Sequence, residues 1–331
     1  MTTPLLSVRD LEIAFRSDGT DIPVVRDLSF DLAHGETLGI VGESGCGKSI
    51  TALSLLGLVP SPPGRATKGQ ILFEGEDLVG AREQRLNQVR GNDISMVFQE
   101  PMTSLNPVYT IGEQIAETAR VHFGLSKAKA WKRAVEMLSL VGIPSPDQRA
   151  YDYPHQLSGG MRQRVMIAIA LVCEPKILIA DEPTTALDVT VQAQIFDLFQ
   201  DLKRQIGAAI ILITHDIGVV AQMTDRVMVM YAGRKIEEAP VAQFVRDPRH
   251  PYTSGLVSCI PRLMMPPSDE VEDLFEIPGV VPAPRDLNRP GCPFSPRCNR
   301  VMPRCRDENP ALEVRADGRK VACWLETEVA A

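Results

Sequence analysis

The segment QLSGGMRQRVMIAIALVCEPKILIADEPTTALD, residues 156–188, decides the fold and the chemistry of this chain. Two adjacent glycines stand just before a long apolar stretch, and the apolar run that follows ends in Asp181 and Glu182. A helix that starts with bare backbone is a phosphate-binding element, and acids at the end of a buried strand are typical of a magnesium and water site. The segment therefore predicts a second phosphate cradle elsewhere in the chain.

The bulk composition limits the classes of function. The 331 residues are 44% hydrophobic and 23% charged, with a net charge of -7, which suits one large domain with an appendage. Because phosphate backbones attract basic faces, this acidic balance argues against a nucleic-acid partner. No run approaches the roughly 20 apolar residues of a spanning helix, and the start MTTPLLSVRDLEIAF lacks the features of a signal peptide. We expect a cytoplasmic chain, held at a membrane only by partners.

The hydrophobic patterns predict an α/β core. Residues 11–15 and 24–32 alternate apolar and polar side chains, as half-buried antiparallel strands do. The continuous apolar runs 176–181 and 209–214 are typical of strands buried on both faces. Helical spacing fills residues 111–173. This order predicts a mostly parallel sheet with a helical insertion.

A change of texture after about residue 240 predicts a second region. The core is expected to close with a hairpin over 226–239, and the chain then becomes rich in proline. We therefore expect one domain over residues 1–245 and a loop-rich extension over residues 246–331.

A glycine-rich loop supplies the second cradle. GESGCGKS (42–49) fits G-x-x-x-x-G-K-[ST] between an apolar run and a helical pattern. Its backbone N–H groups can surround a β-phosphate at the positive end of the helix. We expect Lys48 to reach the β- and γ-phosphates and Ser49 to bind Mg²⁺; the plainer alternative is a tight turn that binds nothing. The residues expected to line the cradle are Gly42, Glu43, Ser44, Gly45, Cys46, Gly47, Lys48, Ser49 and Ile50.

The two acids at the end of run 176–181 complete this interpretation. Asp181 is placed to hold the magnesium shell at the carboxyl end of a buried strand. Glu182 follows and is placed to orient or deprotonate an attacking water. The alternative for Glu182 is a helix-capping or salt-bridged acid.

The motifs together resemble those of the ATP-binding-cassette ATPases. The pieces come in the family's order: GESGCGKS, Gln99 in MVFQEP, LSGGMRQ (157–163), ILIADEP, ALD (186–188) and ITHD. The resemblance covers about residues 5–245. It implies a P-loop NTPase core with a mostly parallel sheet, an N-terminal antiparallel β-subdomain and a helical signature subdomain over about 102–173.

The family's arrangement explains the two adjacent glycines. In this family the second phosphate-binding helix start comes from a partner cassette. The resemblance implies that Ser158, Gly159 and Gly160 contact the γ-phosphate of a nucleotide on the other subunit, where bare backbone permits close approach. Because this chain has one signature, the implied unit is a dimer with two nucleotides at its interface.

Further roles follow from the resemblance. Glu182 resembles the general base, and His215 resembles the switch histidine that touches the γ-phosphate. Gln99 resembles the residue that joins the magnesium shell and senses the transport domain, and Asp188 the acid that couples the two sites. Phe15 matches the aromatic that stacks on adenine. Plain core positions are the alternatives for Phe15 and His215.

The tail narrows the resemblance to one branch. HPYTSGLVSCIPR (250–262), IPGVVPAP (277–284) and the cysteine-containing end are similar to the C-terminal extension of oligopeptide/dipeptide transporter ATPases, and MTSLNP (102–107) fits the same branch. This implies an ATPase at the cytoplasmic face of the cell (inner) membrane that energises peptide import. The implied partners are a second ATPase subunit, two transmembrane permease subunits and an extracytoplasmic peptide-binding protein. A paralogous chain is expected as the second ATPase subunit, with a homodimer as the alternative.

The cysteines of the tail suggest a soft metal. Cys292, Cys298, Cys305 and Cys323 have the spacing C-x5-C-x6-C-x17-C, which is neither a zinc knuckle nor a common ferredoxin pattern. Some members of the branch carry a four-cysteine cluster here, so a [4Fe–4S] cluster is expected, with structural Zn²⁺ or unligated thiols as alternatives. Cys46 belongs to the cradle. The apolar surroundings of Cys173 and Cys259 predict core positions.

Two other classes of function compete with transport. A non-transport cassette protein would act on ribosomes or DNA, but such proteins usually join two cassettes in one chain or insert long coiled coils. A purely regulatory nucleotide-binding module is disfavoured by Glu182 and His215. The cargo stays open among dipeptides, longer peptides, nickel complexes and glutathione, because the ATPase does not touch it.

Overall fold

The computed structural model describes the whole chain except residues 1–2, 100–103, 186, 260–275, 289 and 327–331. The chain divides into two compact units. The first consists of Gly80–Ile213 with two short stretches, Met1–Leu5 and Leu32–Thr37. The second consists of Leu6–Asp31, Leu38–Val79 and Thr214–Ala331.

The first unit contains parallel strands in the order β6-β7-β8. Every residue of β7 and β8 is buried, as the continuous apolar runs predicted. Parallel neighbours need a crossover connection, and α8 supplies it between β7 and β8 with a buried face that includes Ile195, Phe199 and Leu202. The bounds are β6 Ile94–Val97, β7 Ile177–Asp181, α8 Val189–Ile206 and β8 Ala209–Ile213.

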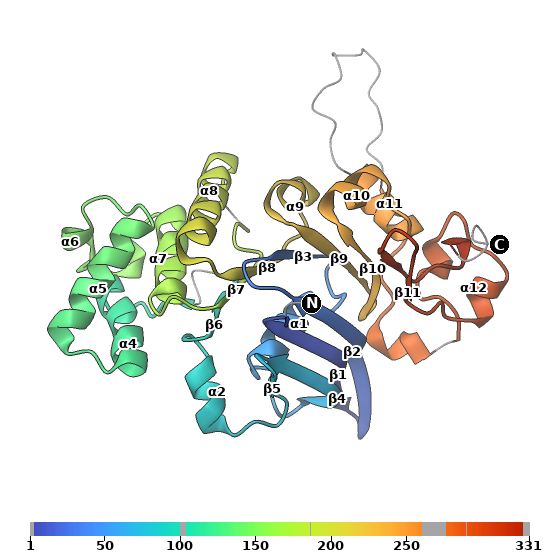
Figure 1. The fold of residues 1–331 in the computed structure, drawn as a ribbon, viewed down its shortest axis with the longest axis horizontal. Helices are drawn as coiled ribbons and strands as arrows, with labels where there is room; N and C mark the ends of the chain where they lie inside the picture. Colours follow the sequence, from blue (N-terminus) through green and yellow to red (C-terminus); the bar gives the residue numbers. More distant parts are fainter. Residues whose placement is uncertain (1–2, 100–103, 186, 260–275, 289, 327–331) are drawn as a thin grey trace, which may run out of the picture. The chain divides into compact units, whose positions relative to one another are not determined.

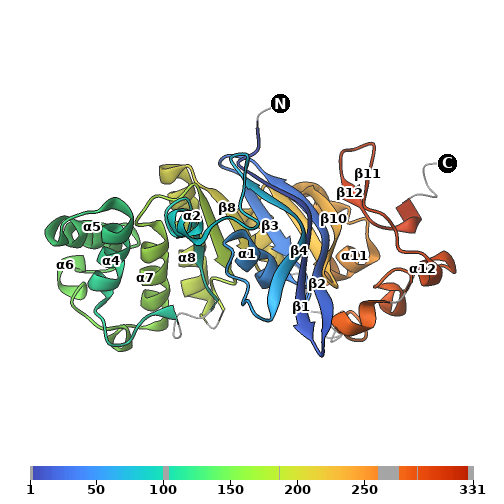
Figure 2. The ribbon, with the colours of Figure 1, turned by 90° about the horizontal axis from the view of Figure 1, so that it is seen from below.

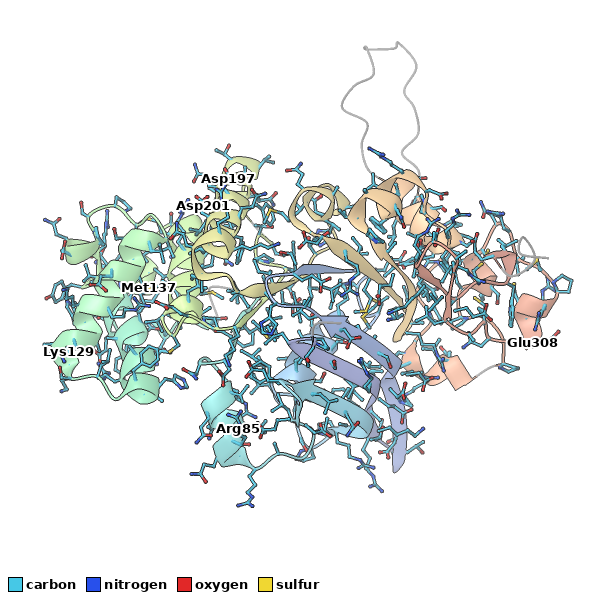
Figure 3. The ribbon with its side chains drawn as sticks, viewed as in Figure 1. Arg85, Lys129, Met137, Asp197, Asp201 and Glu308 are labelled. Atoms are coloured by element: carbon cyan, nitrogen blue, oxygen red, sulfur yellow. The ribbon has the colours of Figure 1, made fainter. Side chains whose placement is uncertain are left out.

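Helices α4 to α7 of the first unit form the predicted helical insertion, shown in green to yellow-green in Figure 1, and α2 precedes it in the chain. On α5, Met137 is buried and Lys129 is exposed (Figure 3). Ser126 lies at the N-cap of α5, without a side-chain bond to the helix, and Cys173 is buried as expected. The bounds are α2 Glu83–Val89, α4 Ile111–Phe123, α5 Lys127–Leu140, α6 Pro146–Arg149 and α7 Gly159–Leu171.

The second unit contains the predicted antiparallel subdomain, a sheet with the order β2-β1-β4-β5. Figure 2 shows three of its strands, β1, β2 and β4. Strand β1 pairs antiparallel with β4, with Leu6 opposite Phe73 and Phe15 opposite Gly64. The bounds are β1 Leu6–Ser17, β2 Thr20–Leu32, β4 Gly64–Phe73 and β5 Glu76–Asp77.

The remaining strands of the second unit have the order β11-β12-β10-β9-β3. Strands β3 and β9 are parallel, and β9 and β10 form the predicted hairpin. The hairpin is not the edge, because β12 pairs with β10, with Glu237 opposite Val321. The bounds are β3 Thr37–Val41, α1 Lys48–Leu55, α9 Ile217–Met223, β9 Arg226–Tyr231, β10 Arg234–Pro240, α10 Val241–Arg246, α11 Pro251–Ser258, α12 Arg304–Asp307, β11 Glu313–Val314 and β12 Lys320–Val321.

The extension after residue 245 shares a core with the strands before it. Tyr231, Phe244, Tyr252 and Phe294 are fully buried together, with the Tyr231 and Tyr252 ring centroids 4.7 Å apart. The prediction for Cys259 was wrong: this cysteine is exposed, because it lies at the C-cap beyond α11, whose buried residues are Tyr252, Thr253 and Gly255.

Candidate functional site

The glycine-rich loop has a backbone that only glycine can follow. It leaves β3 at Gly42, with φ 152°, and enters α1 after Gly47, with φ 103°. A Cβ on Gly42 would lie 2.3 Å from the carbonyl oxygen of Met230, and one on Gly47 would lie 3.0 Å from that of Val24. Both glycines are therefore required by φ and by space.

The lysine of the loop is held from within. Lys48 is 6% exposed, and its Nζ donates to the carbonyl oxygens of Gly42 (2.7 Å) and Glu43 (3.1 Å). Ser44 and Ser49 of the loop are exposed to solvent. The first turn of α1 carries no acid, so its N–H groups and its positive end suit an anion.

Cys46 supports the loop from beneath. Its side chain is fully buried, and burial raises the pKa of its thiol. A Cβ on Gly42 would lie 2.7 Å from the sulfur, and the carbonyl oxygen of Cys46 accepts a bond from the Gly233 N–H at 3.0 Å. The thiol therefore packs under the cradle and takes no exposed position in the loop.

In the first unit, the acids at the end of β7 lie in different settings. Asp181 is 4% exposed, whereas Glu182 has φ 46°, a strained conformation for this residue. One carboxylate oxygen of Glu182 accepts bonds from Gln99 Nε2 (2.9 Å) and Thr185 Oγ1 (3.0 Å). The structure thus joins Gln99 to Glu182 and adds Thr185, which the sequence analysis did not select.

The signature segment begins α7. Ser158 caps the helix, accepting from the Met161 N–H at 3.3 Å. A Cβ on Gly160 would lie 2.7 Å from Val191 Cγ1 of α8, while one on Gly159 would meet Leu187 at an ordinary 3.6 Å. Gly160 is therefore explained by packing inside the chain, and Gly159 is not.

Three other predicted residues have defined places. Asp188 caps α8, accepting from the Val191 N–H at 2.9 Å. Phe15 is half-buried, with its ring beside Gly64, where a Cβ would lie 3.0 Å from Cε1. His215 is exposed just before α9, which disagrees with a core histidine.

The four cysteines of the extension surround one small cavity. Its volume is about 20 Å³, and all four side chains line it. Burial raises the pKa of Cys292 and that of Cys323 to about 11. Over the described residues, no group of three or more His, Cys, Asp or Glu side chains is arranged to hold a metal. A space of this size is about enough for one water molecule, and over the described residues nothing supports the [4Fe–4S] cluster or Zn²⁺.

In the described part of the chain, no helix combines the length and the apolar character that crossing a bilayer requires.

The loop and the signature segment define the class of this protein. A glycine loop between a buried strand and a helix, with a lysine at the helix start, is the phosphate site of P-loop nucleotide triphosphatases. The segment LSGGMRQ (157–163), whose Ser158 caps α7, matches the signature sequence of the ATP-binding cassettes.

Comparison with known proteins identifies the family. Residues 25–185 match the ABC transporter family model, and residues 236–305 match the oligopeptide/dipeptide transporter C-terminal region. The dipeptide transport ATP-binding protein DppD of Bacillus subtilis (strain 168) is 48% identical over 98% of this chain and 95% of its own length. The oligopeptide transport ATP-binding protein AppD of the same organism is 50% identical over 98% and 97%. The chain therefore belongs to the ATP-binding proteins of ABC transporters, in the branch with the oligopeptide/dipeptide C-terminal region.

Solved structures confirm the fold class. A dimeric post-hydrolysis state of the ATP-binding cassette MJ0796 with ADP and Pi has a TM-score of 0.64 at 27% identity, covering 71% of this chain and 98% of that one. CbiO1 of Clostridium perfringens, from the transporter complex cbiONQ, has a TM-score of 0.63 at 28% identity, covering 75% and 93%.

Proposed function

We propose that this chain hydrolyses ATP to energise the import of di- or oligopeptides through an ABC transporter. The observation that carries the proposal is similarity to dipeptide and oligopeptide transport ATP-binding proteins over 98% of the chain, cassette and extension included. The glycine loop, Lys48 and the acids that end β7 give the chemistry of ATP hydrolysis a physical basis.

Residues from both units have roles in the proposed chemistry. The N–H groups at the start of α1 and Lys48 bind the β- and γ-phosphates. Ser49, Gln99 and Asp181 would hold Mg²⁺, which supplies charge neutralisation on the phosphates. Glu182 takes the proton of the attacking water, and its carboxylate is oriented for this by the bonds from Gln99 and Thr185.

The proposed working unit is a pair of cassettes. The exposed start of α7 at Ser158 and Gly159 would contact the γ-phosphate of a nucleotide on a companion ATPase subunit. Because this chain carries one such segment, a closed site needs a companion. A paralogous subunit is our proposal, with His215 and Asp188 linking hydrolysis to pair closure.

An exposed apolar patch in the helical group suits docking to membrane subunits. Val108, Tyr109 and Tyr151 are 73%, 54% and 64% exposed. Their segments lie together, because the N–H of Ile111 donates to the carbonyl oxygen of Asp152 at 2.9 Å. Large exposed apolar side chains gathered in one place mark interaction sites. We propose that permease helices cover this patch, which places the chain at the cytoplasmic face of the membrane as a peripheral subunit.

Reconstitution of the complex tests the proposal. The chain is co-produced with its permease subunits, placed in proteoliposomes and supplied with peptide-loaded binding protein. We expect peptide-stimulated ATP hydrolysis and ATP-dependent peptide uptake. ATP binding without peptide stimulation, combined with stimulation by nickel complexes or glutathione, would contradict the peptide assignment and keep the ATPase.

Metal binding at the four cysteines stays a separate proposal, supported by the thiols around one cavity. Metal analysis of anaerobically purified protein tests it. Iron in the ratio of a [4Fe–4S] cluster, with a broad visible absorbance, would support the cluster, and zinc would support the alternative. Absence of both metals would contradict metal binding, and the four thiols would then serve only in packing.

A further inference from the structure

Arg297 and Tyr252 of the extension both form hydrogen bonds with Glu43 of the glycine loop. Arg297 donates from both terminal nitrogens to the Glu43 carboxylate, at 2.6 and 2.8 Å. From α11, the hydroxyl of Tyr252 accepts the Glu43 backbone N–H at 2.8 Å. The side chain and the main chain of Glu43 are thus both held from beyond residue 245.

Arg297 is itself rigidly placed. Its side chain is 5% exposed, and its Nε donates to the carbonyl oxygen of Pro278 at 2.8 Å. The guanidinium lies 5.9 Å from the ring centroid of Tyr231 and 6.0 Å from that of Phe294. The paired bonds with Glu43 raise the pKa of Arg297, so this cation stays charged. A bidentate pair formed by a buried guanidinium fixes orientation as well as distance.

Glu43 in turn touches the groups that bind phosphate. Its carbonyl oxygen accepts from Lys48 Nζ at 3.1 Å and from the Cys46 N–H at 3.3 Å. A shift of Glu43 therefore displaces the lysine anchor and the middle of the loop together.

We propose that Arg297 and Tyr252 are positioning residues for nucleotide binding, acting through Glu43. The extension is then a structural part of the ATP cradle. This proposal rests on the proposed function, because it assumes that the loop binds ATP. Neither residue touches the nucleotide; they hold the loop in the conformation that the phosphates require.

The competing explanation is that the Arg297–Glu43 pair only stabilises the fold. Arg319 provides a matched control for such a role. The Arg319 side chain is 4% exposed and bonds Asp247 and Asp317 without contacting the loop. Removing either arginine deletes its ion pairs and its bond to a backbone carbonyl, which lowers stability. Only removal of Arg297 should change how the loop binds ATP.

The experiment compares Arg297→Ala, Arg319→Ala and the wild type. The affinity for Mg-ATP, KM and kcat are measured in the reconstituted complex, with thermal melting of each chain. We expect Arg297→Ala to weaken ATP binding and raise KM about tenfold, with a smaller change in kcat, because a misplaced loop loses affinity. Arg319→Ala should melt earlier with unchanged KM. Equal KM values for both variants and the wild type would overturn the proposal.

Two further variants cover the remaining outcomes. If Arg297→Ala fails to fold, Arg297→Lys keeps the charge and loses the paired geometry, so a raised KM supports the proposal and an unchanged KM opposes it. In a Glu43→Ala background, Arg297→Ala should add little, because its effect passes through Glu43. A full additive effect would contradict that route. Absence of ATP binding by the wild type would instead contradict the proposed function itself.

Discussion

Substitutions at Gly159 and Gly160, the two glycines of the signature segment, should distinguish a role in packing from a role in nucleotide contact. In Gly160→Ala the new Cβ lies 2.7 Å from Val191 Cγ1, well inside the 3.4 Å of an ordinary contact. Overpacking of this kind costs about 1–3 kcal/mol, and the gain from replacing glycine in a helix returns up to about 1 kcal/mol. We expect a net loss of about 1–2 kcal/mol, or about 2–8 °C in melting temperature.

Gly159→Ala is the matched variant. Its Cβ would meet Leu187 Cδ2 at 3.6 Å, which is an ordinary contact, so the fold should be unaffected or slightly stabilised. If Gly159 approaches a nucleotide on the companion cassette, ATP hydrolysis by the reconstituted complex should still fall by about tenfold or more.

Thermal melting and hydrolysis are measured for Gly159→Ala, Gly160→Ala, Val191→Ala and Gly160→Ala with Val191→Ala. The double variant should recover the melting temperature lost by Gly160→Ala, because the clash is removed. A Gly160→Ala chain as stable as the wild type would refute the packing argument. A fully active Gly159→Ala complex would refute the contact with the companion's nucleotide.

Three further outcomes are expected. Glu182→Gln should retain ATP binding, since an amide oxygen can still accept from Gln99 and Thr185, and should lower kcat by about 10²–10⁴-fold; unchanged single-turnover hydrolysis would exclude Glu182 as the base. Lys48→Ala should weaken ATP binding by removing the phosphate cation, as titration calorimetry can check; wild-type affinity would disprove its role. Burial lowers the pKa of His250 from 6.5 to about 3, so the unfolded chain binds the extra proton, and stability is lost as pH falls below 6.5. Unfolding free energies at pH 7 and pH 5 should differ by about 2 kcal/mol through this residue, and His250→Asn, which can still accept the Tyr252 N–H, should reduce the difference; an equal pH dependence would exclude His250 as its source.

The elements with strong local signals could be predicted from the sequence. Strands β7 and β8 follow continuous apolar runs, and the glycine loop follows a pattern whose spacing has few other uses. Ser158 was selected for a nucleotide contact and Asp188 for coupling the two sites, and the structure shows in addition that both side chains cap helices.

The features that escaped prediction depend on contacts between distant segments. Strand β10 carries Lys235 and Glu238, 2% and 6% exposed, which read as surface charges until their pairing is seen. Burial would raise the pKa of Glu238, but Lys235 and Arg226 outweigh it and hold that pKa at about 2. The addition of β12 to β10 and the grip of Arg297 on Glu43 join residues more than 80 positions apart. No local pattern encodes such partners.

The shared core around Tyr231 and Phe294 limits where the protein can be truncated. A cassette trimmed at residue 245 would lose Tyr252 and Phe294, leave Tyr231 and Phe244 facing water, and strip β10 of its neighbour β12. Such a fragment would expose the unpaired edge of β10 beside an apolar surface, and both features promote aggregation. Minimal versions made for biochemistry or crystallisation should therefore keep the extension, and fusion partners are better attached at the ends of the full chain.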